Sequence, residues 1–341
     1  MLGYPPLEQA LANSQTAAAR SEALNRPKNI GATEQEATGQ QADTIVWVQE
    51  TANAAWSRRD SMGEVVFDGK MWLLGGYTPA RANDVWYSGD GLNWTQVTAA
   101  APWGKRNLPG SVVHEGKMWI IGGYKLDGRS SYNDVWHSID GVNWTAATEN
   151  AAWKPRGAAG AVVFAGRIWV MGGFDIDGFK HYNDVWFSED GKNWKQAERL
   201  APWSERGMQG CVVFQEKMWV LGGGVYNHNF PFNTIADYND VWCSGDGLKW
   251  EQVTAKAPWT ERRFHSAIVY DDKIWILAGY HQANRNDVWY SSDGKTWREA
   301  KSEKMWPIRH EPGCLVFKER LWLFGGFGAT LYNDVWSYGK Q

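Results

Sequence analysis

The chain has 341 residues, 24 of them Trp, and 35 Lys and Arg residues against 38 Asp and Glu residues give a net charge of −3. This balance argues against nucleic-acid binding by electrostatics, and no apolar run reaches the roughly 18 residues that predict a membrane span. The three cysteines, Cys211, Cys243 and Cys314, have no paired spacing, so we expect neither a disulfide framework nor a metal site.

Residues 1–42 contain no Trp and are rich in Ala, Gln, Thr and Glu. The stretch PPLEQALANSQTAAARSEAL predicts a helix with a thin apolar stripe, and the residues after Pro27 predict a linker. The start lacks the basic and apolar regions of a secretory signal. We therefore expect an anchor or linker that binds a protein partner, in the cytoplasm or in a larger assembly such as a virion.

The remainder, residues 43–341, is built from an internal repeat. A unit of Arg, about 16 residues, Gly-Gly, a loop, Asn-Asp-Val-Trp and then Asp-Gly-x-x-Trp recurs between residues 59 and 336. A full unit carries four Trp, and Trp47 and Trp56 supply the two that the last unit lacks. The diglycines begin at Gly75, Gly122, Gly172, Gly222 and Gly325, with Ala278-Gly279 as the one departure.

Each unit predicts four short antiparallel strands. Segments such as VVFDGKMWLLGGY, NDVWYS and NWTQV are β-branched and aromatic, with Gly and Asp-Gly turns between them. Trp47 in IVWVQ corresponds to Trp94 in LNWTQV, so residues 44–49 should supply the missing outer strand of the last unit. The predicted fold is an all-β, six-bladed β-propeller of four-stranded blades, closed by that N-terminal strand.

The repeat resembles the Kelch family of β-propellers, of the galactose-oxidase central-domain type, whose repeats run to about 50 residues with a diglycine after the second strand. The resemblance covers residues 44–338. The Ser-x-Asp-Gly-x-x-Trp turns, as in residues 291–297, are similar to a shortened Asp-box hairpin of sialidase-type propellers. The Kelch resemblance implies recognition through the loops that join the second strand to the third and the fourth to the first.

Residues present in every unit are more typical of architecture than of one asymmetric ligand site. The repeated Arg and the Asp of Asn-Asp should lie on the same face, called here the upper face, where a bidentate pair would fix the spacing of the blades. The arginines are Arg59, Arg106, Arg156, Arg206, Arg262 and Arg309. The aspartates are Asp84, Asp134, Asp184, Asp240, Asp287 and Asp334.

Two features of the upper face predict a binding site. Aromatic residues follow five of the six diglycine positions, and rings around a shallow opening suit a sugar or a peptide; they are Tyr77, Tyr124, Phe174, Tyr280 and Phe327. In the fourth unit a loop over residues 224–238 is longer than its counterparts, which is typical of a functional loop. It contributes Tyr226, His228, Asn229, Phe230 and Phe232.

These features favour a non-catalytic recognition module that binds a glycan or a protein on the upper face, with no catalytic residue, cofactor or metal. The alternative is a carbohydrate-active enzyme, such as a sugar mutarotase or epimerase, with its site at the upper pore. Glu311 with His265 or Arg263 is the constellation that this alternative would use. Convergent carboxylates, or three His within reach of a metal, would favour the enzyme.

Overall fold

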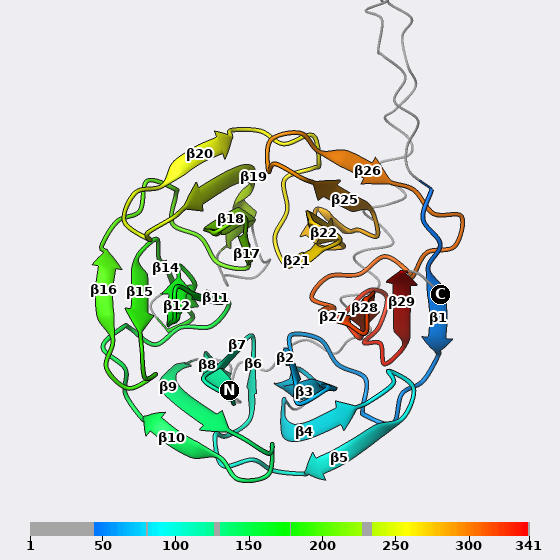
Figure 1. Ribbon diagram of the computed structural model, residues 1–341, viewed down its shortest axis with the longest axis horizontal. Helices are drawn as coiled ribbons and strands as arrows, with labels where there is room; N and C mark the ends of the chain where they lie inside the picture. The colour runs from blue at the N-terminus through cyan, green and yellow to red at the C-terminus, as the bar shows by residue number, and fades with distance from the viewer. Residues whose placement is uncertain (1–43, 80, 126–129, 178, 227–233, 340–341) are drawn as a thin grey trace, which may run out of the picture. The chain divides into compact units, whose positions relative to one another are not determined.

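A computed structural model describes residues 44–79, 81–125, 130–177, 179–226 and 234–339. Everything regular in these residues is β-strand, and none of their segments is a helix long and apolar enough to cross a membrane. The chain divides into two units, Met1–Gln41 and Ala42–Gln341. The described strands all belong to the second unit, and its sheets surround a common centre (Figure 1).

Most strands pair in antiparallel groups of four that follow the chain order. The first group contains β2 Gly63–Phe67, β3 Lys70–Gly76, β4 Ala82–Ser88 and β5 Trp94–Thr98. The second contains β7 Gly110–His114, β8 Lys117–Lys125, β9 Ser131–Ser138 and β10 Thr145–Thr148, and β6 Arg106–Asn107 joins it to the first as one nine-stranded sheet. The third contains β11 Gly160–Phe164, β12 Arg167–Met171, β15 Val185–Ser188 and β16 Lys195–Glu198.

The later groups follow the same pattern, and the last group is completed by a strand that precedes the first group in the chain. The fourth group contains β17 Gly210–Phe214, β18 Lys217–Tyr226, β19 Thr234–Ser244 and β20 Glu251–Thr254. The fifth contains β21 Ser266–Tyr270, β22 Lys273–Leu277, β25 Val288–Ser291 and β26 Arg298–Ala300. The last contains β27 Gly313–Phe317, β28 Arg320–Phe324, β29 Val335–Gly339 and β1 Val48–Thr51. Two small hairpins are β13 Phe174–Asp175 with β14 Lys180–His181, and β23 Tyr280–His281 with β24 Ala283–Asn284.

The N-terminal strand pairs with β29, as its sequence suggests, but over different residues. We expected a strand at 44–49, whereas β1 covers Val48–Thr51 and residues 45–47 precede it without strand pairing. A register shift between Gln49 and Thr51 interrupts the ladder. Trp47 is fully buried and belongs to the core cluster instead, so its burial, rather than strand pairing, positions this segment.

A ring of backbone hydrogen bonds connects the turns that precede the inner strands. Each amide donates to the carbonyl of the equivalent residue in the preceding group, as Leu108 does to Ser61 at 2.8 Å and Glu311 does to Phe264 at 2.8 Å. The Ser61 amide faces the Glu311 carbonyl at 3.4 Å. All of these residues have a left-handed backbone, with φ between 51° and 58°: Ser61, Leu108, Ala158, Met208, Phe264 and Glu311. This arrangement of sheets is consistent with a β-propeller.

Tryptophan side chains fill the spaces between neighbouring sheets. Indoles from adjacent groups meet edge to face, as Trp153 and Trp194 do with centroids 5.8 Å apart at 89°. Trp47 and Trp306 form the equivalent contact at 4.3 Å and 88°. The other pairs are Trp56–Trp94, Trp103–Trp144, Trp203–Trp250 and Trp259–Trp297. Buried indoles contribute large apolar areas in this geometry, so the core consists of interfaces between sheets.

The repeated Arg–Asp pairs are confirmed, and each pair stays within its own repeat. Arg156 donates to both carboxylate oxygens of Asp184, at 2.5 and 3.0 Å, and to the carbonyl of Gly172 at 2.8 Å. The Trp186 indole donates to the same carboxylate at 2.8 Å. The arginine side chains are 0% or 1% exposed in all the pairs with equivalent geometry. The buried charge is therefore fully hydrogen-bonded.

The Asp-Gly turns hold neighbouring sheets against one another. In the first repeat, the Asp90 carboxylate accepts hydrogen bonds from the Leu92 and Asn93 amides, while Ser88 Oγ accepts one from the Gly91 amide. Gly91 has a φ of 81°, and a Cβ there would lie 2.1 Å from the Trp322 ring of the last group. Glycine is required because an indole occupies the space of any side chain.

Candidate functional site

A cavity of about 220 Å³ lies between the inner ends of the sheets. Its lining includes the six residues with a left-handed backbone, together with residues of the strands that follow them. Left-handed conformations are unfavourable for residues with a Cβ. Here the backbone ring imposes that conformation, and each repeat consequently contributes the side chain at this position to the cavity lining.

The cavity lining combines polar and apolar side chains. Ser61, Glu64, Ser111 and Glu311 come from the first, second and last groups of strands. The positions equivalent to Ser61 and Glu311 are apolar in the other repeats, and Gln209, His265 and Ser266 add polar groups beside them. The apolar residues are Leu108, Ala158, Met208 and Phe264. Because the backbone repeats while the side chains do not, the asymmetry of the cavity comes from sequence alone.

Two carboxyl groups meet on one hydroxyl at the edge of this cavity. Ser61 Oγ lies 2.7 Å from Asp60 Oδ1 and also contacts Glu311 Oε2. A serine hydroxyl has a single proton to donate, so it cannot satisfy two ionised carboxylates at once. The two acids come from opposite ends of the repeat array and are brought together where the last group of strands adjoins the first.

The environment of both acids favours the protonated form. Burial raises the pKa of Asp60 to about 7, against opposing contributions from the Ser61 hydrogen bond and the charge of Arg81. Burial also raises the pKa of Glu311 well above its usual value, and the neighbouring Asp60 charge adds to this effect. Apolar surroundings and a like charge both penalise the carboxylate.

Glu64, on strand β2, places a third carboxyl group in the cavity lining. Burial raises its pKa to about 8, although a hydrogen bond from the Cys314 amide opposes the shift. The Cys314 thiol is itself buried, and burial together with the Glu64 charge raises its pKa well above the usual value. A thiol held in its protonated form is a poor nucleophile, so we assign Cys314 to packing.

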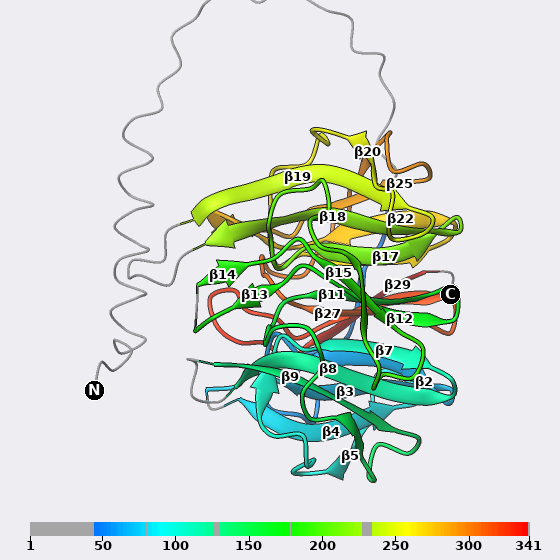
Figure 2. The same ribbon diagram turned by 90° about the vertical axis from the view of Figure 1, so that its left-hand side faces the viewer.

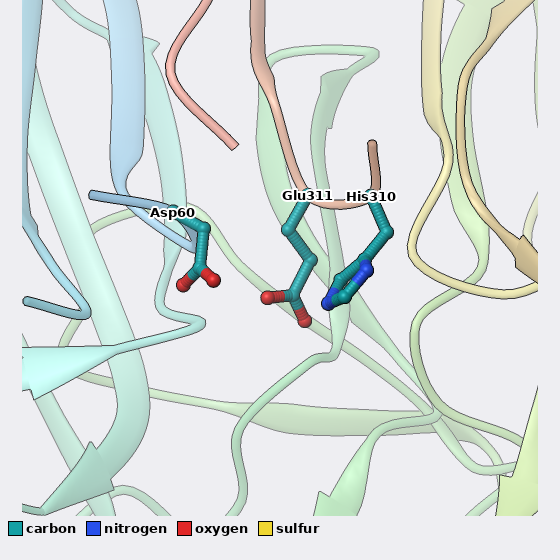
Figure 3. Close-up of side chains that lie close together, drawn as sticks. All are labelled: Asp60, His310 and Glu311. Carbon is teal, nitrogen blue, oxygen red and sulfur yellow. The ribbon is translucent and has the colours of Figure 1, made fainter. Parts of the chain in front are cut away.

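His310 lies beside Glu311, and its ring packs against aromatic neighbours and is held at one nitrogen. Nδ1 lies 2.6 Å from Asn284 Oδ1. The rings of Phe264 and Phe327 lie at 5.5 and 5.4 Å from the imidazole. Burial, followed by the charge of Arg263, lowers the pKa of His310 to about 3, which makes the imidazole neutral at physiological pH. Figure 3 shows it next to Glu311, with Asp60 across the gap.

A second polar cluster joins the fourth and fifth groups of strands. The buried Asp237 carboxylate accepts from Arg263 at 2.5 Å and lies 2.9 Å from His281 Nδ1. Asp237 belongs to β19, which extends with β18 past the neighbouring strands (Figure 2). The cluster therefore fixes the base of this long hairpin to the next sheet.

The aromatic residues predicted from the diglycines divide into two sets. Tyr77, Tyr280 and Phe327 are half-buried. Tyr124 and Phe174 are 3% and 0% exposed and pack in one cluster with Ala158, Ile176 and Met208. These two rings have almost no surface free for a ligand, and their binding role stays a prediction.

The long loop of the fourth repeat is partly strand. We expected a loop over residues 224–238, but β18 reaches Tyr226 and β19 begins at Thr234, with Val225 paired to Ala236. The β-branched Val225, Thr234 and Ile235 favour this extension. The expected ligand contacts His228, Asn229, Phe230 and Phe232 lie outside the described residues, and the side chain of Tyr226 does as well.

The constellation considered for an enzyme forms only in part. Glu311 converges with Asp60 and Ser61, while His265 lines the same cavity. Burial and the charge of Arg262 lower the pKa of His265 to about 3. Asp60, Ser61 and Glu64 were not predicted as site residues. The signal lay in the two positions after each repeated Arg, where the units differ in residue type: Asp60-Ser61, Asn107-Leu108, Gly157-Ala158, Gly207-Met208, Arg263-Phe264 and His310-Glu311.

Comparison with known proteins shows a similarity in fold. No protein-family model and no curated protein matches the sequence. Among solved structures, one titled "Structure of YjhT" superposes with a TM-score of 0.68 at 14% sequence identity, covering 85% of this chain and 96% of that chain. Together with the antiparallel four-stranded sheets, this likeness supports a propeller-like fold.

Proposed function

We propose that residues 43–341 form a six-bladed Kelch-type propeller, closed by β1, that recognises a small polyhydroxylated ligand in its central cavity without transforming it. The hydrogen-bond ring and the Trp47–Trp306 contact support the closure. The repeated diglycines support the Kelch assignment. Recognition is proposed at the upper face because the turns that hold Asp60, Ser61 and Glu311 precede the inner strands there.

The observation that carries this function is the mixed polar and apolar lining of the cavity. Glu64, Ser111 and Glu311 offer hydrogen-bonding groups, and Phe264 offers an apolar ring. A pyranose has the same division, with hydroxyl groups at its edge and C–H groups on its faces. The volume of about 220 Å³ is below the roughly 300–1,000 Å³ of pockets for drug-sized ligands, which favours a ligand of one ring.

The test is binding of a monosaccharide panel to the full chain, measured by calorimetry and by saturation-transfer NMR. Phe264→Ala and Ser111→Ala should each weaken binding about 10-fold or more, because a packed aromatic or a buried hydrogen bond is lost. Leu92→Ala, at an exposed turn, is the matched control. Equal affinities for all three variants would place recognition elsewhere.

A second candidate function is a sugar mutarotase or epimerase, and one observation favours it. Asp60 and Glu311 converge on Ser61 at the edge of the cavity, and paired carboxyl groups in a pocket are typical of carbohydrate-active enzymes. Anomer exchange, followed by magnetisation-transfer NMR for each sugar that binds, distinguishes the two candidates. A faster exchange of anomers that Glu311→Gln abolishes would support the enzyme. Binding of a sugar without faster exchange would support the non-catalytic recognition module.

We further propose that residues 1–42, outside the described part of the chain, attach the protein to a partner in a larger assembly such as a virion. The support is their distinct composition, with no Trp and many Ala, Gln and Glu. Affinity capture by a peptide of residues 1–42, compared with a scrambled peptide of equal composition, tests this. Capture of the same proteins by both peptides would contradict it.

A further inference from the structure

Three metal-ligating side chains of two kinds face one another at the edge of the cavity. One ligand atom each from Asp60, His310 and Glu311 lies within 4.8 Å of the other two. Figure 3 shows the imidazole with a ring nitrogen turned toward the Glu311 carboxyl. Asp60 lies in the turn before β2, whereas His310 and Glu311 lie in the turn before β27, so the juxtaposition depends on the packing of these two turns.

The acids lack the partners that buried carboxyl groups normally have. Asp60 is 5% exposed, its Oδ1 contacts Ser61, and no described residue donates to its Oδ2. No Lys or Arg in the described part of the chain lies within ion-pair distance of Asp60 or Glu311, although the charges of Arg81 and Arg263 act on these acids from farther away. Buried carboxyl groups are normally paired or bound to a metal. An Asp60 oxygen without a protein donor, facing the same gap as a second acid and an imidazole, therefore points to a cation.

The imidazole is oriented in the way that metal-binding histidines are. Asn284 Oδ1 lies 2.6 Å from Nδ1, so it accepts the Nδ1 proton, and Nε2 is left with its lone pair. No described residue forms a hydrogen bond with Nε2. A carbonyl or carboxylate oxygen that holds the second ring nitrogen is a regular feature of histidine metal ligands, and here Asn284 provides it.

We propose that Asp60, His310 and Glu311 bind one divalent transition-metal ion, Zn²⁺ or Mn²⁺, at the edge of the central cavity. A neutral imidazole with two carboxylates suits these ions, whereas Mg²⁺ and Ca²⁺ prefer oxygen ligands alone. Three protein ligands leave at least one coordination position open toward the cavity, as in sites where a metal contacts a small ligand. Ligands of one ion lie about 3–4 Å apart, so binding draws the three groups closer together.

The site goes beyond the proposed function, because metal binding can be measured without any sugar. The experiment uses the full chain without a polyhistidine tag, stripped with chelator and dialysed against Zn²⁺, Mn²⁺, Mg²⁺ or Ca²⁺. Bound metal is measured by mass spectrometry and affinity by calorimetry. We expect one Zn²⁺ or Mn²⁺ per chain, at least about 100-fold tighter than Mg²⁺ or Ca²⁺.

Variants connect the binding to the three residues. His310→Gln and Glu311→Gln should remove stoichiometric binding, and Asn284→Ala, which acts through the imidazole, should weaken it about 10- to 100-fold. The matched controls are His137→Gln, on β9, and Glu189→Gln, in the turn after β15. Circular dichroism on each variant shows whether it is folded. If a variant of a metal ligand unfolds, Asn284→Ala still tests the site, because Asn284 is not itself a ligand.

Two results would overturn the site. One is a wild-type protein that binds neither Zn²⁺ nor Mn²⁺ at millimolar concentration. The other is binding that survives in folded His310→Gln and Glu311→Gln proteins with unchanged affinity. Loss of sugar binding with intact metal binding would contradict the proposed function and leave the metal site standing, so the two failures are distinguishable.

Discussion

Glu64 shows how a single side chain in the cavity connects pH with stability. Its pKa is raised from 4.5 to about 8 by burial, so between these values the folded chain holds a proton that the unfolded chain has released. Stability therefore falls as pH rises from 4.5 to 8. Glu64→Gln should remove this contribution, so its melting temperature should rise relative to wild type as pH increases from 5 to about 8. Parallel melting curves across this range, for Glu64→Gln and for the exposed control Glu115→Gln alike, would contradict the burial of this carboxyl group.

Gly91 and Gly89 offer a second comparison at the scale of one residue. A Cβ on Gly91 would lie 2.1 Å from the Trp322 ring, whereas a Cβ on Gly89 meets nothing within 4 Å. Gly91→Ala should lower the free energy of unfolding by about 2–4 kcal/mol, through the left-handed backbone and the clash with an indole. Gly89→Ala should change it by less than about 1 kcal/mol in the same urea titration. Similar losses in the two variants would show that the Trp322 contact is not what selects glycine.

At the scale of the element, a buried and an exposed ion pair of the same repeat should differ greatly in their contribution to the free energy of unfolding. Arg156 and Asp184 are almost fully buried and bidentate, while Arg167 and Glu189 are 41% and 67% exposed. Asp184→Asn leaves a buried guanidinium without its counter-ion and should cost about 3–5 kcal/mol. Glu189→Gln should cost no more than about 1 kcal/mol. Chemical denaturation of both variants checks the contrast, which fails if the two losses are equal.

Strands and turns could be predicted where the sequence repeats, but not where the units differ. The diglycines, the Asp-Gly turns and the Arg–Asp pairs recur in register. Comparing the units therefore identifies the strands, the turns and the ion pairs. Asp60 stands one position after Arg59 and Glu311 two positions after Arg309, and the two acids are 251 positions apart. Their proximity depends on the first and last repeats becoming neighbours, and no local pattern encodes that contact. The extension of β18 and β19 was missed for another reason, because its length follows from pairing between two segments that we expected to be part of one long loop.

At the scale of the whole molecule, the N-terminal strand connects the two ends of the repeat array. β1 pairs with β29, and Trp47 is 0% exposed against Trp306. Deleting residues 1–51 would expose the backbone edge of β29 and remove a buried indole, and we expect aggregation and a markedly lower melting temperature. Deleting residues 1–41 removes only the other unit and should leave the melting temperature within about 2 °C of wild type. Equal melting temperatures for the two truncations would refute the closing role of β1.

The backbone ring at the cavity has a consequence for how such a protein changes over evolutionary time. Its hydrogen bonds use amide and carbonyl groups alone, so none of them depends on which side chain a repeat carries at that position. Ser, Leu, Ala, Met, Phe and Glu already occupy the six equivalent places. A substitution at one of them alters what the cavity can hold while the scaffold around it stays the same. The residues that specify the architecture are thus different from those that specify the ligand. A few changes at residues 61, 108, 158, 208, 264 and 311 are enough for related proteins to bind different ligands with the same fold.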